Sequence, residues 1–281
     1  MSRTLLKTDD HSRDSAGMRY VYPVISRRAG GVSVGINLNP NNACNWRCIY
    51  CQVPDLKRGG PPPLDLGLLE QELNDFLHAA IAGDFMAVRV PAGARRLVDV
   101  AFSGNGEPTS APEFPAAVGI VERALASHGL TDSVLMRLIT NGSLLDRKSV
   151  QAGIAQIGRA GGEVWFKLDA GTATGMARIN GTRARPEIVA RRLTCCARLA
   201  PTWIQTCLFQ LDGEPPAALE FQAYLDLLAP LAKLLAGVHL YSLARPSLQK
   251  EAPRLGRLDA AWLEQAAGPI RKLGLAVIVS P

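Results

Sequence analysis

Three cysteines lie close together in the segment NPNNACNWRCIYCQVP, where Cys44, Cys48 and Cys51 have the spacing C-x3-C-x2-C. Thiolates from one short loop can wrap a compact metal centre, and soft sulfur ligands favour iron–sulfur clusters or zinc over hard cations. A structural zinc ion normally has four protein ligands, yet this segment contains no fourth cysteine and no histidine. The spacing therefore predicts a metal centre with one open position, and a zinc ion completed by a distant residue is the alternative.

A second candidate is the turn FSGNGEPT, which contains Gly104, Asn105, Gly106 and Glu107. Glycine lets the backbone approach a ligand closely, so this turn is either a binding turn or an ordinary glycine turn after a strand. Because it directly follows a predicted strand in a chain that has a cysteine loop, the binding turn is favoured.

Polar residues also follow three later predicted strands. Asn141 in ITNGSLL either faces the site or caps the next helix. Lys167 and Asp169 in FKLDAGT lie on the same side of their strand, so they are either site residues or a structural ion pair. Gln205 and Tyr241 belong to two further strands, and we expect both to lie near the site.

These candidates follow short apolar segments that alternate with longer helical patterns. Predicted strands cover residues 32–38, 97–102, 134–139, 164–168, 203–209 and 238–243, and residues 275–279 are a candidate additional strand. Predicted helices cover residues 66–82, 113–127, 146–157, 186–199, 216–235 and 259–273. Two further segments, residues 54–63 and 91–96, are predicted loops. The alternation indicates βα units around a parallel sheet.

The predicted architecture is an α/β fold, a partial (βα)6-type TIM barrel with one candidate extra C-terminal strand. No linker interrupts the series, so we expect a single barrel domain at residues 18–281, preceded by a poorly ordered segment at residues 1–17. In such barrels the active site is built from loops at the C-terminal ends of the strands. The candidate residues are therefore expected to converge there.

Composition limits the compartment and the kind of partner. The chain has 281 residues, 47% of them hydrophobic and 20% charged, which is typical of a soluble protein. The first seventeen residues lack an apolar stretch and so predict no secretory signal, and no membrane span is expected. We therefore expect a cytoplasmic protein with reduced thiols. The net charge is +6, but the basic residues are spread as pairs, which is more typical of a solvated surface than of a nucleic-acid site.

The cysteine segment has Tyr50 in the aromatic slot of C-x3-C-x-aromatic-C and thereby resembles the radical S-adenosylmethionine (radical SAM) superfamily. The resemblance implies the partial TIM barrel of that superfamily and a [4Fe–4S] cluster on Cys44, Cys48 and Cys51. It implies that the remaining iron binds S-adenosyl-L-methionine, whose reductive cleavage gives a 5′-deoxyadenosyl radical that abstracts hydrogen from a substrate. An external one-electron reductant of the flavodoxin or ferredoxin type is implied as well.

The same resemblance implies cofactor contacts for the other candidates. The turn from Gly104 to Glu107 matches a Gly-Gly-Glu type motif with Asn105 as the middle residue, and in the superfamily this motif holds the methionine amine. Residues at the positions of Lys167 and Asp169 contact the ribose or carboxylate, and adenine is held near Tyr241. The predicted cofactor-binding residues are Tyr50, Gly104, Asn105, Gly106, Glu107, Asn141, Lys167, Asp169, Gln205 and Tyr241.

Within the superfamily, FSGNGEPT, KLDAGT and LYSLARP resemble a bacterial branch related to tRNA wyosine synthases. Those enzymes carry additional N-terminal cysteines for a second cluster, whereas residues 1–43 contain none, so a single-cluster relative is expected. Cys195, Cys196 and Cys207 are expected to be buried thiols. The substrate is an RNA nucleoside, a protein or a metabolite. The non-enzymatic alternative is a zinc-stabilised barrel that binds RNA or protein.

Overall fold

The computed structural model describes residues 5–7, 17–26 and 30–281, so the prediction for residues 1–17 lies largely outside the described part. Within that part, eight strands form one sheet in the order β1-β2-β5-β6-β7-β8-β10-β12. These strands are β1 (Val21–Ser26), β2 (Gly31–Ile36), β5 (Leu97–Phe102), β6 (Leu135–Thr140), β7 (Glu163–Lys167), β8 (Thr202–Cys207), β10 (Gly237–Tyr241) and β12 (Val277–Ser280). All neighbours pair in parallel except β1 and β2, which are antiparallel.

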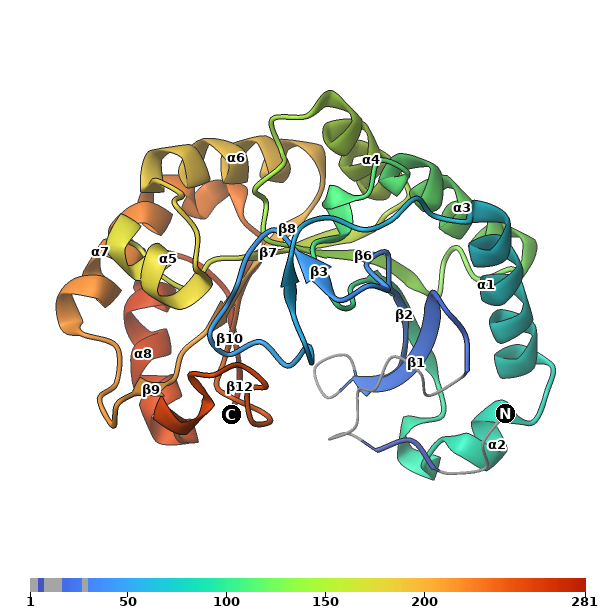
Figure 1. The fold of residues 1–281 in the computed structure, drawn as a ribbon, viewed down its shortest axis with the longest axis horizontal. Helices are drawn as coiled ribbons and strands as arrows, with labels where there is room; N and C mark the ends of the chain where they lie inside the picture. The colour runs from blue at the N-terminus through green and yellow to red at the C-terminus, as the bar shows by residue number, and fades with distance from the viewer. Residues whose placement is uncertain (1–4, 8–16, 27–29) are drawn as a thin grey trace.

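The sheet curls, and helices cover its outer side (Figure 1). The helices are α1 (Leu66–Ile81), α2 (Phe85–Arg89), α3 (Phe114–Ser127), α4 (Lys148–Arg159), α5 (Ala173–Asn180), α6 (Pro186–Leu199), α7 (Ala218–Leu228) and α8 (Ala260–Lys272). The outer strands β1 and β12 do not pair with each other in the described part of the chain, so the barrel is open. The predicted partial α/β barrel is confirmed, including its extra C-terminal strand.

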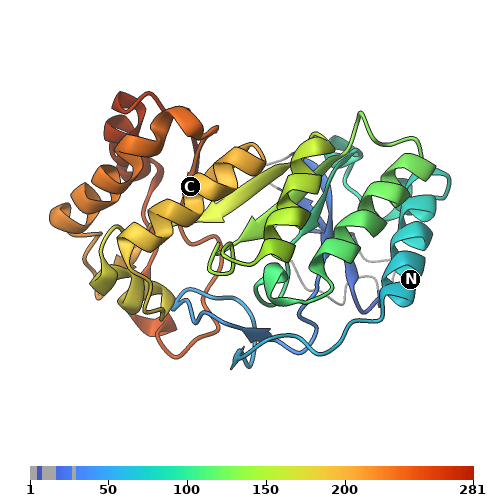
Figure 2. The same cartoon turned by 90° about the horizontal axis from the view of Figure 1, so that it is seen from above.

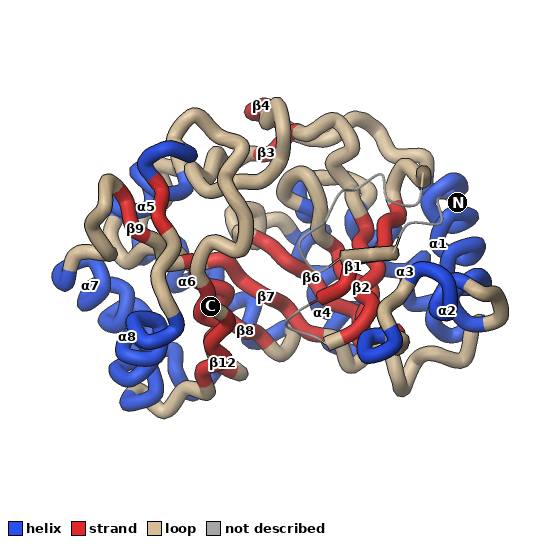
Figure 3. The backbone as a smooth tube through the Cα atoms, turned by 90° about the horizontal axis from the view of Figure 1, so that it is seen from below, coloured by secondary structure: helices blue, strands red, loops and turns tan. Residues whose placement is uncertain are grey.

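Short elements complete the loops. Two small two-stranded sheets pair β3 (Ala43–Cys44) with β4 (Lys57–Arg58), and β9 (Gln210–Leu211) with β11 (Leu255–Gly256). Four 3-10 turns are described, namely η1 (Ala92–Ala94), η2 (Pro108–Ser110), η3 (Ala229–Leu234) and η4 (Ala252–Arg254). Figures 2 and 3 show β3 and the loop around it beyond one end of the strands. The cysteine loop therefore covers one end of the barrel.

Local sequence signals account for several helix boundaries. Asp65 caps α1, because its carboxylate accepts a hydrogen bond of 3.0 Å from the backbone N–H of Leu68. Thr172 caps α5 in the same way, through the N–H of Gly175 at 2.9 Å. The predicted helix at residues 216–235 ends as a helix at Leu228 and continues as η3, because Pro230 lacks the backbone N–H that a continuing helix needs.

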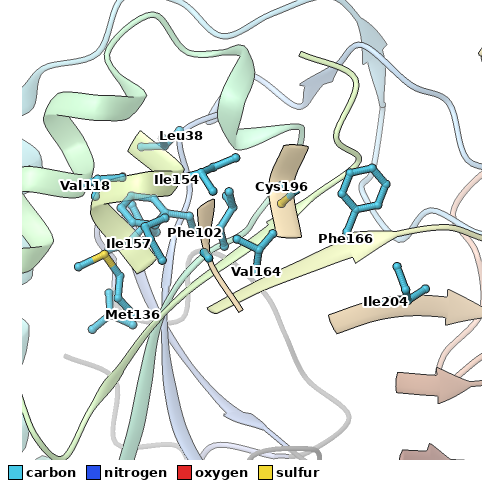
Figure 4. Close-up of a cluster of buried hydrophobic side chains, with 14 of the residues drawn as sticks. Leu38, Phe102, Val118, Met136, Ile154, Ile157, Val164, Phe166, Cys196 and Ile204 are labelled. Carbon is cyan, nitrogen blue, oxygen red and sulfur yellow. The ribbon is translucent and has the colours of Figure 1, made fainter. Parts of the chain in front are cut away.

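The hydrophobic core lies between the outer face of the sheet and the helices. Phe102 and Phe166 on the strands pack in the same cluster as Val118, Ile154 and Ile157 on the helices, and all five are almost completely buried (Figure 4). Burying such side chains contributes about 1.5–3 kcal/mol each to folding. The inner face carries both polar and apolar side chains, among them Arg137, Lys167 and Ile139. No helix among the described residues is both long and apolar enough to cross a bilayer.

Candidate metal and cofactor site

A cavity of about 610 Å³ opens inside the barrel, beneath the cysteine loop. Every predicted site residue except Asp169 lines it. The predicted residues in its wall are Cys44, Cys48, Tyr50, Cys51, Gly104, Asn105, Gly106, Glu107, Asn141, Lys167, Gln205 and Tyr241. They come from the cysteine loop and from the C-terminal ends of β5, β6, β7, β8 and β10, so the convergence expected for a barrel is present.

Backbone hydrogen bonds hold the cysteine loop from two sides. On one side, the N–H groups of Arg47 and Ile49 donate to the carbonyls of Asn180 and Ile179 at the end of α5, over 3.0 and 2.9 Å. On the other side, the N–H of Leu248 donates to the carbonyl of Cys51 over 3.0 Å. The loop is thus fixed between the segments that follow β7 and β10.

None of the three loop cysteines forms a disulfide within the described residues, and each is half-buried. Burial raises the pKa of Cys44 and of Cys48 to about 12, so both are protonated in the metal-free protein. A bound metal requires thiolates, and loading would therefore release protons. Within the described residues, no three side chains of His, Cys, Asp or Glu converge closely enough to hold a single metal ion. A [4Fe–4S] cluster does not require such convergence, because each cysteine ligates a different iron, and the donor set fits three of its corners.

Glu107 ends up buried between two loops. Its Oε1 accepts hydrogen bonds from the N–H and hydroxyl of Thr109, at 3.1 and 2.6 Å, and from the hydroxyl of Thr140 at 2.6 Å. Its Oε2 accepts from the N–H of Asn141 at 2.7 Å. Burial nevertheless raises the pKa of Glu107. Because a carboxylate oxygen has two lone pairs, Oε2 can accept one further hydrogen bond from a ligand in the cavity.

The two glycines of FSGNGEPT are explained by contacts within the protein. A Cβ on Gly106 would lie 2.1 Å from the carbonyl oxygen of Ala43, and one on Gly104, whose φ is +133°, would lie 2.5 Å from the side chain of Asn37. Both glycines also line the cavity, so the predicted approach of this turn to a ligand stays a prediction. Glycine here lets the turn pack against the cysteine loop and the end of β2.

Replacing Gly106 with alanine should push the Ala43–Cys44 segment out of place. We expect a loss of about 1–3 kcal/mol in the free energy of unfolding, typical of overpacking at a rigid contact. Urea unfolding of the metal-free protein measures it. Gly93→Ala is the matched control, because a Cβ there meets nothing within 4 Å, and its effect should stay within about 0.5 kcal/mol. Equal effects of the two substitutions would refute the close contact.

Asp169 does not line the cavity but lies behind Tyr50. Its Oδ2 accepts hydrogen bonds from the Tyr50 hydroxyl at 2.5 Å and from the Asn180 amide at 2.7 Å, and its Oδ1 accepts from the N–H of Cys207 at 2.9 Å. The carboxylate is thereby occupied by protein donors, and no salt bridge joins it to Lys167 in the described part of the chain. Asp169 therefore holds the side chains of Tyr50 and Asn180 in place.

Lys167 presents an ammonium group to the cavity. Its Nζ lies 3.1 Å from the hydroxyl of Tyr241 and 5.1 Å from the centre of the Tyr50 ring. Burial lowers the pKa of Lys167, but the nearby Tyr241, Asp169 and Cys48 outweigh this effect and raise it overall. The side chain is therefore a cation over two aromatic rings, suited to bind a carboxylate or hydroxyl group of a ligand.

The remaining predicted residues are Asn105, Asn141 and Gln205. All three line the cavity, and the two asparagines also form hydrogen bonds within the protein. Asn141 does not cap the next helix, α4, which begins at Lys148. Its Oδ1 accepts from the N–H of Ser143 at 3.0 Å within the turn after β6, and its Nδ2 donates to Asn45 at 2.8 Å in the cysteine loop. The Asn105 amide donates to Asn42 in the same loop over 2.7 Å. Gln205 is buried in the cavity wall. Both asparagines connect the turns after β5 and β6 to the cysteine loop.

A polar floor, formed by the ion-paired residues Asp99, Arg137 and Glu163, lies deeper in the barrel and was not expected from the sequence. Arg137 forms ion pairs with Asp99 and with Glu163, the latter at 2.8 Å, and its guanidinium lies 4.2 Å from the centre of the Trp165 ring. Asp99, Arg137 and Trp165 line the cavity. The signal was present, because LVDVAF and LMRLIT each contain one charged residue on the alternating face of an otherwise apolar strand. The hydroxyl of Ser33 also donates to Asp99.

No protein-family model matches the chain. Among curated proteins, the GTPase Obg of Brachyspira hyodysenteriae is 24% identical over 130 residues, which is 46% of this chain and 16% of that protein. The chain thus spans a small part of that relative's length. It contains no Gly-Lys pair and hence no phosphate-binding loop of the GxxxxGK[ST] type.

Solved structures show similarity over almost the whole barrel. A radical SAM methyltransferase from Sphaerobacter thermophilus matches with a TM-score of 0.59 and 15% identity, over 92% of this chain and 68% of that one. Streptococcus suis SuiB bound to S-adenosylmethionine matches with a TM-score of 0.58 and 12% identity, over 90% of this chain and 50% of that one. The chain spans about half the length of SuiB. At these identities the likeness concerns architecture, and the chain has the partial α/β barrel fold found in radical SAM enzymes.

Proposed function

We propose that this protein is a radical SAM enzyme with one [4Fe–4S] cluster on Cys44, Cys48 and Cys51. The observation that carries the proposal is that three thiols of one loop, the Glu107 carboxylate and the Lys167 ammonium line a single cavity. When bound there, the cluster and S-adenosylmethionine supply a 5′-deoxyadenosyl radical by reductive cleavage. The superfamily barrel of the chain and the solved relative bound to S-adenosylmethionine support this assignment.

The residues of the cavity have complementary roles in holding the cofactor. The free acceptor position of Glu107 suits the amine of the methionine moiety, and Lys167 suits its carboxylate or the ribose hydroxyls. Tyr50 and Tyr241 provide aromatic faces against which the adenosine can pack. The half-buried position of the three cysteines limits contact between a bound cluster and water.

The chain's other cysteines support a single cluster. Cys196 is buried and receives a hydrogen bond from the Thr202 hydroxyl, and Cys195 is only partly buried, whereas Cys207 is buried and lines the cavity as a single further thiol. A flavodoxin- or ferredoxin-like protein is the proposed electron donor. We propose an RNA nucleoside, a protein or a metabolite as substrate, in a branch related to tRNA wyosine synthases by the motifs FSGNGEPT, KLDAGT and LYSLARP.

Cleavage of S-adenosylmethionine tests the proposal. Anaerobically reconstituted protein, reduced with dithionite, should convert S-adenosylmethionine to methionine and 5′-deoxyadenosine in equal amounts, as measured by liquid chromatography. The same protein without reductant is the control and should give neither product. Reduced, iron-loaded protein that forms no 5′-deoxyadenosine would overturn the proposed function.

Replacing Glu107 with glutamine should weaken binding of S-adenosylmethionine while sparing the cluster. The substitution keeps the side-chain shape but removes the charge that strengthens a hydrogen bond to an ammonium group, and such a bond contributes about 1.5–3 kcal/mol. We expect the dissociation constant to rise on the order of 10- to 100-fold. Calorimetry on iron-matched samples measures it. The exposed Glu122→Gln is the control, and equal affinities of the two variants would exclude Glu107 from the binding site.

A further inference from the structure

The side chain of Asn180 lies between the cysteine loop and Asp169. Its Nδ2 is 3.3 Å from Sγ of Cys48 and 2.7 Å from Oδ2 of Asp169, and the residue is buried. An amide NH2 group has two hydrogens, so Nδ2 can donate to both atoms at once. Asn180 was not among the residues expected from the sequence.

The orientation of this amide is fixed by its neighbours. The Asp169 carboxylate also accepts hydrogen bonds from the Cys207 N–H and the Tyr50 hydroxyl, so it acts as an acceptor on every side. Asn180 must therefore present its NH2 group, and not its carbonyl oxygen, to Asp169. The second N–H is then directed to the sulfur of Cys48.

The backbone around Asn180 holds the amide at that distance. The carbonyl of Asn180 accepts the N–H of Arg47 over 3.0 Å, directly beside Cys48. Gly181 ends α5 with a φ of +60°, and a Cβ there would lie 2.9 Å from the carbonyl oxygen of Arg47. Glycine thus lets the end of the helix approach the cysteine loop closely, which brings Asn180 within hydrogen-bond distance of the thiol.

We propose that Asn180 is a positioning residue that donates an N–H···S hydrogen bond to the Cys48 ligand and raises the reduction potential of the cluster. The inference rests on the proposed function. Reduction adds an electron whose charge is partly shared by the cysteine sulfurs, so a donor at the sulfur stabilises the reduced form more than the oxidised form. Asn180 would thereby make the cluster easier to reduce before it transfers an electron to S-adenosylmethionine.

Asn180→Ala removes the donor but keeps the backbone contacts of the loop. We expect the ratio of reduced to oxidised cluster, at any fixed solution potential, to fall about tenfold, which for a one-electron couple is a midpoint lower by about 59 mV. Potentiometric titration followed by EPR measures it on samples with equal iron and sulfide content. Gln249→Ala is the matched control: that amide donates to the backbone carbonyls of Val53 at 3.0 Å and Cys51 at 3.4 Å. Because these contacts are to backbone oxygens and not to a sulfur, their removal should leave the midpoint unchanged.

A measurement on the wild-type protein makes the inference testable even if Asn180→Ala fails to retain a cluster. With ¹⁵N introduced only at asparagine side chains, pulsed EPR of the reduced cluster should detect a ¹⁵N coupling transmitted through the Cys48 sulfur. A missing coupling, or a midpoint equal to wild type in Asn180→Ala, would overturn the role of Asn180 alone. Wild-type protein that assembles no cluster would overturn the proposed function together with it.

Discussion

Cys48→Ala should abolish cluster retention and cleavage of S-adenosylmethionine together. The three thiols of the cysteine loop are the proposed ligands, so the loss of Cys48 leaves two of them; Cys207 also lines the cavity, but it lies on β8 and not in this loop. We expect iron content near background after reconstitution and desalting, and no 5′-deoxyadenosine above the unreduced control. Iron analysis and the chromatographic assay measure both quantities on the same sample.

Cys195→Ala is the control for this substitution. Cys195 lies on α6, packs against the hydrophobic core and does not line the cavity. Its replacement should leave iron content and cleavage at wild-type values. Loss of the cluster in Cys195→Ala would show that the set of ligands includes more than the three loop cysteines.

Arg137→Met should destabilise the fold more than any surface substitution. The guanidinium is the partner of two carboxylates inside the barrel, and the Arg137 and Asp99 side chains are 8% and 1% exposed. Removing one partner of a buried ion pair leaves an uncompensated charge and costs about 3–5 kcal/mol. We expect a loss of this size in the free energy of unfolding of the metal-free protein at neutral pH, as measured with urea.

Arg191→Met provides the comparison on the surface. Arg191 pairs with Asp146 at 3.1 Å, and the two side chains are 63% and 49% exposed. Exposed pairs contribute less than about 1 kcal/mol, because water screens the charges. If the free energy of unfolding falls no more in Arg137→Met than in Arg191→Met, Arg137 is not the centre of the buried ion pairs in the polar floor.

The regular part of the fold was predictable because each βα unit carries its own local signal. The segment 97–102 forms β5 at the predicted residues, and 186–199 forms α6 at its predicted bounds with Pro186 at the start. Strand β1 was missed, since Pro23 interrupts an otherwise strand-like pattern; it fits here because β1 is an edge strand. Helix α5 has only eight residues, too few for a clear helical period.

The site was predictable where a motif marked it and not where folding alone assembled it. The loop cysteines and Glu107 belong to compact motifs, and they line the cavity. Asp169 belongs to the same motif as Lys167, but the hydrogen bond that its carboxylate accepts from the Tyr50 hydroxyl could not be read from the sequence. Asn180 lies more than a hundred residues from Cys48 in sequence, and only the docking of α5 on the cysteine loop brings the two together.

The central claim is that three cysteines hold a [4Fe–4S] cluster and leave one iron for S-adenosylmethionine. Mössbauer spectroscopy of ⁵⁷Fe-reconstituted protein, recorded with and without S-adenosylmethionine, tests it most directly. We predict about four irons and four sulfides per chain, with one iron changing its spectrum when S-adenosylmethionine is added. Zinc bound in place of iron, or a four-iron cluster whose spectrum does not respond to S-adenosylmethionine, would contradict it.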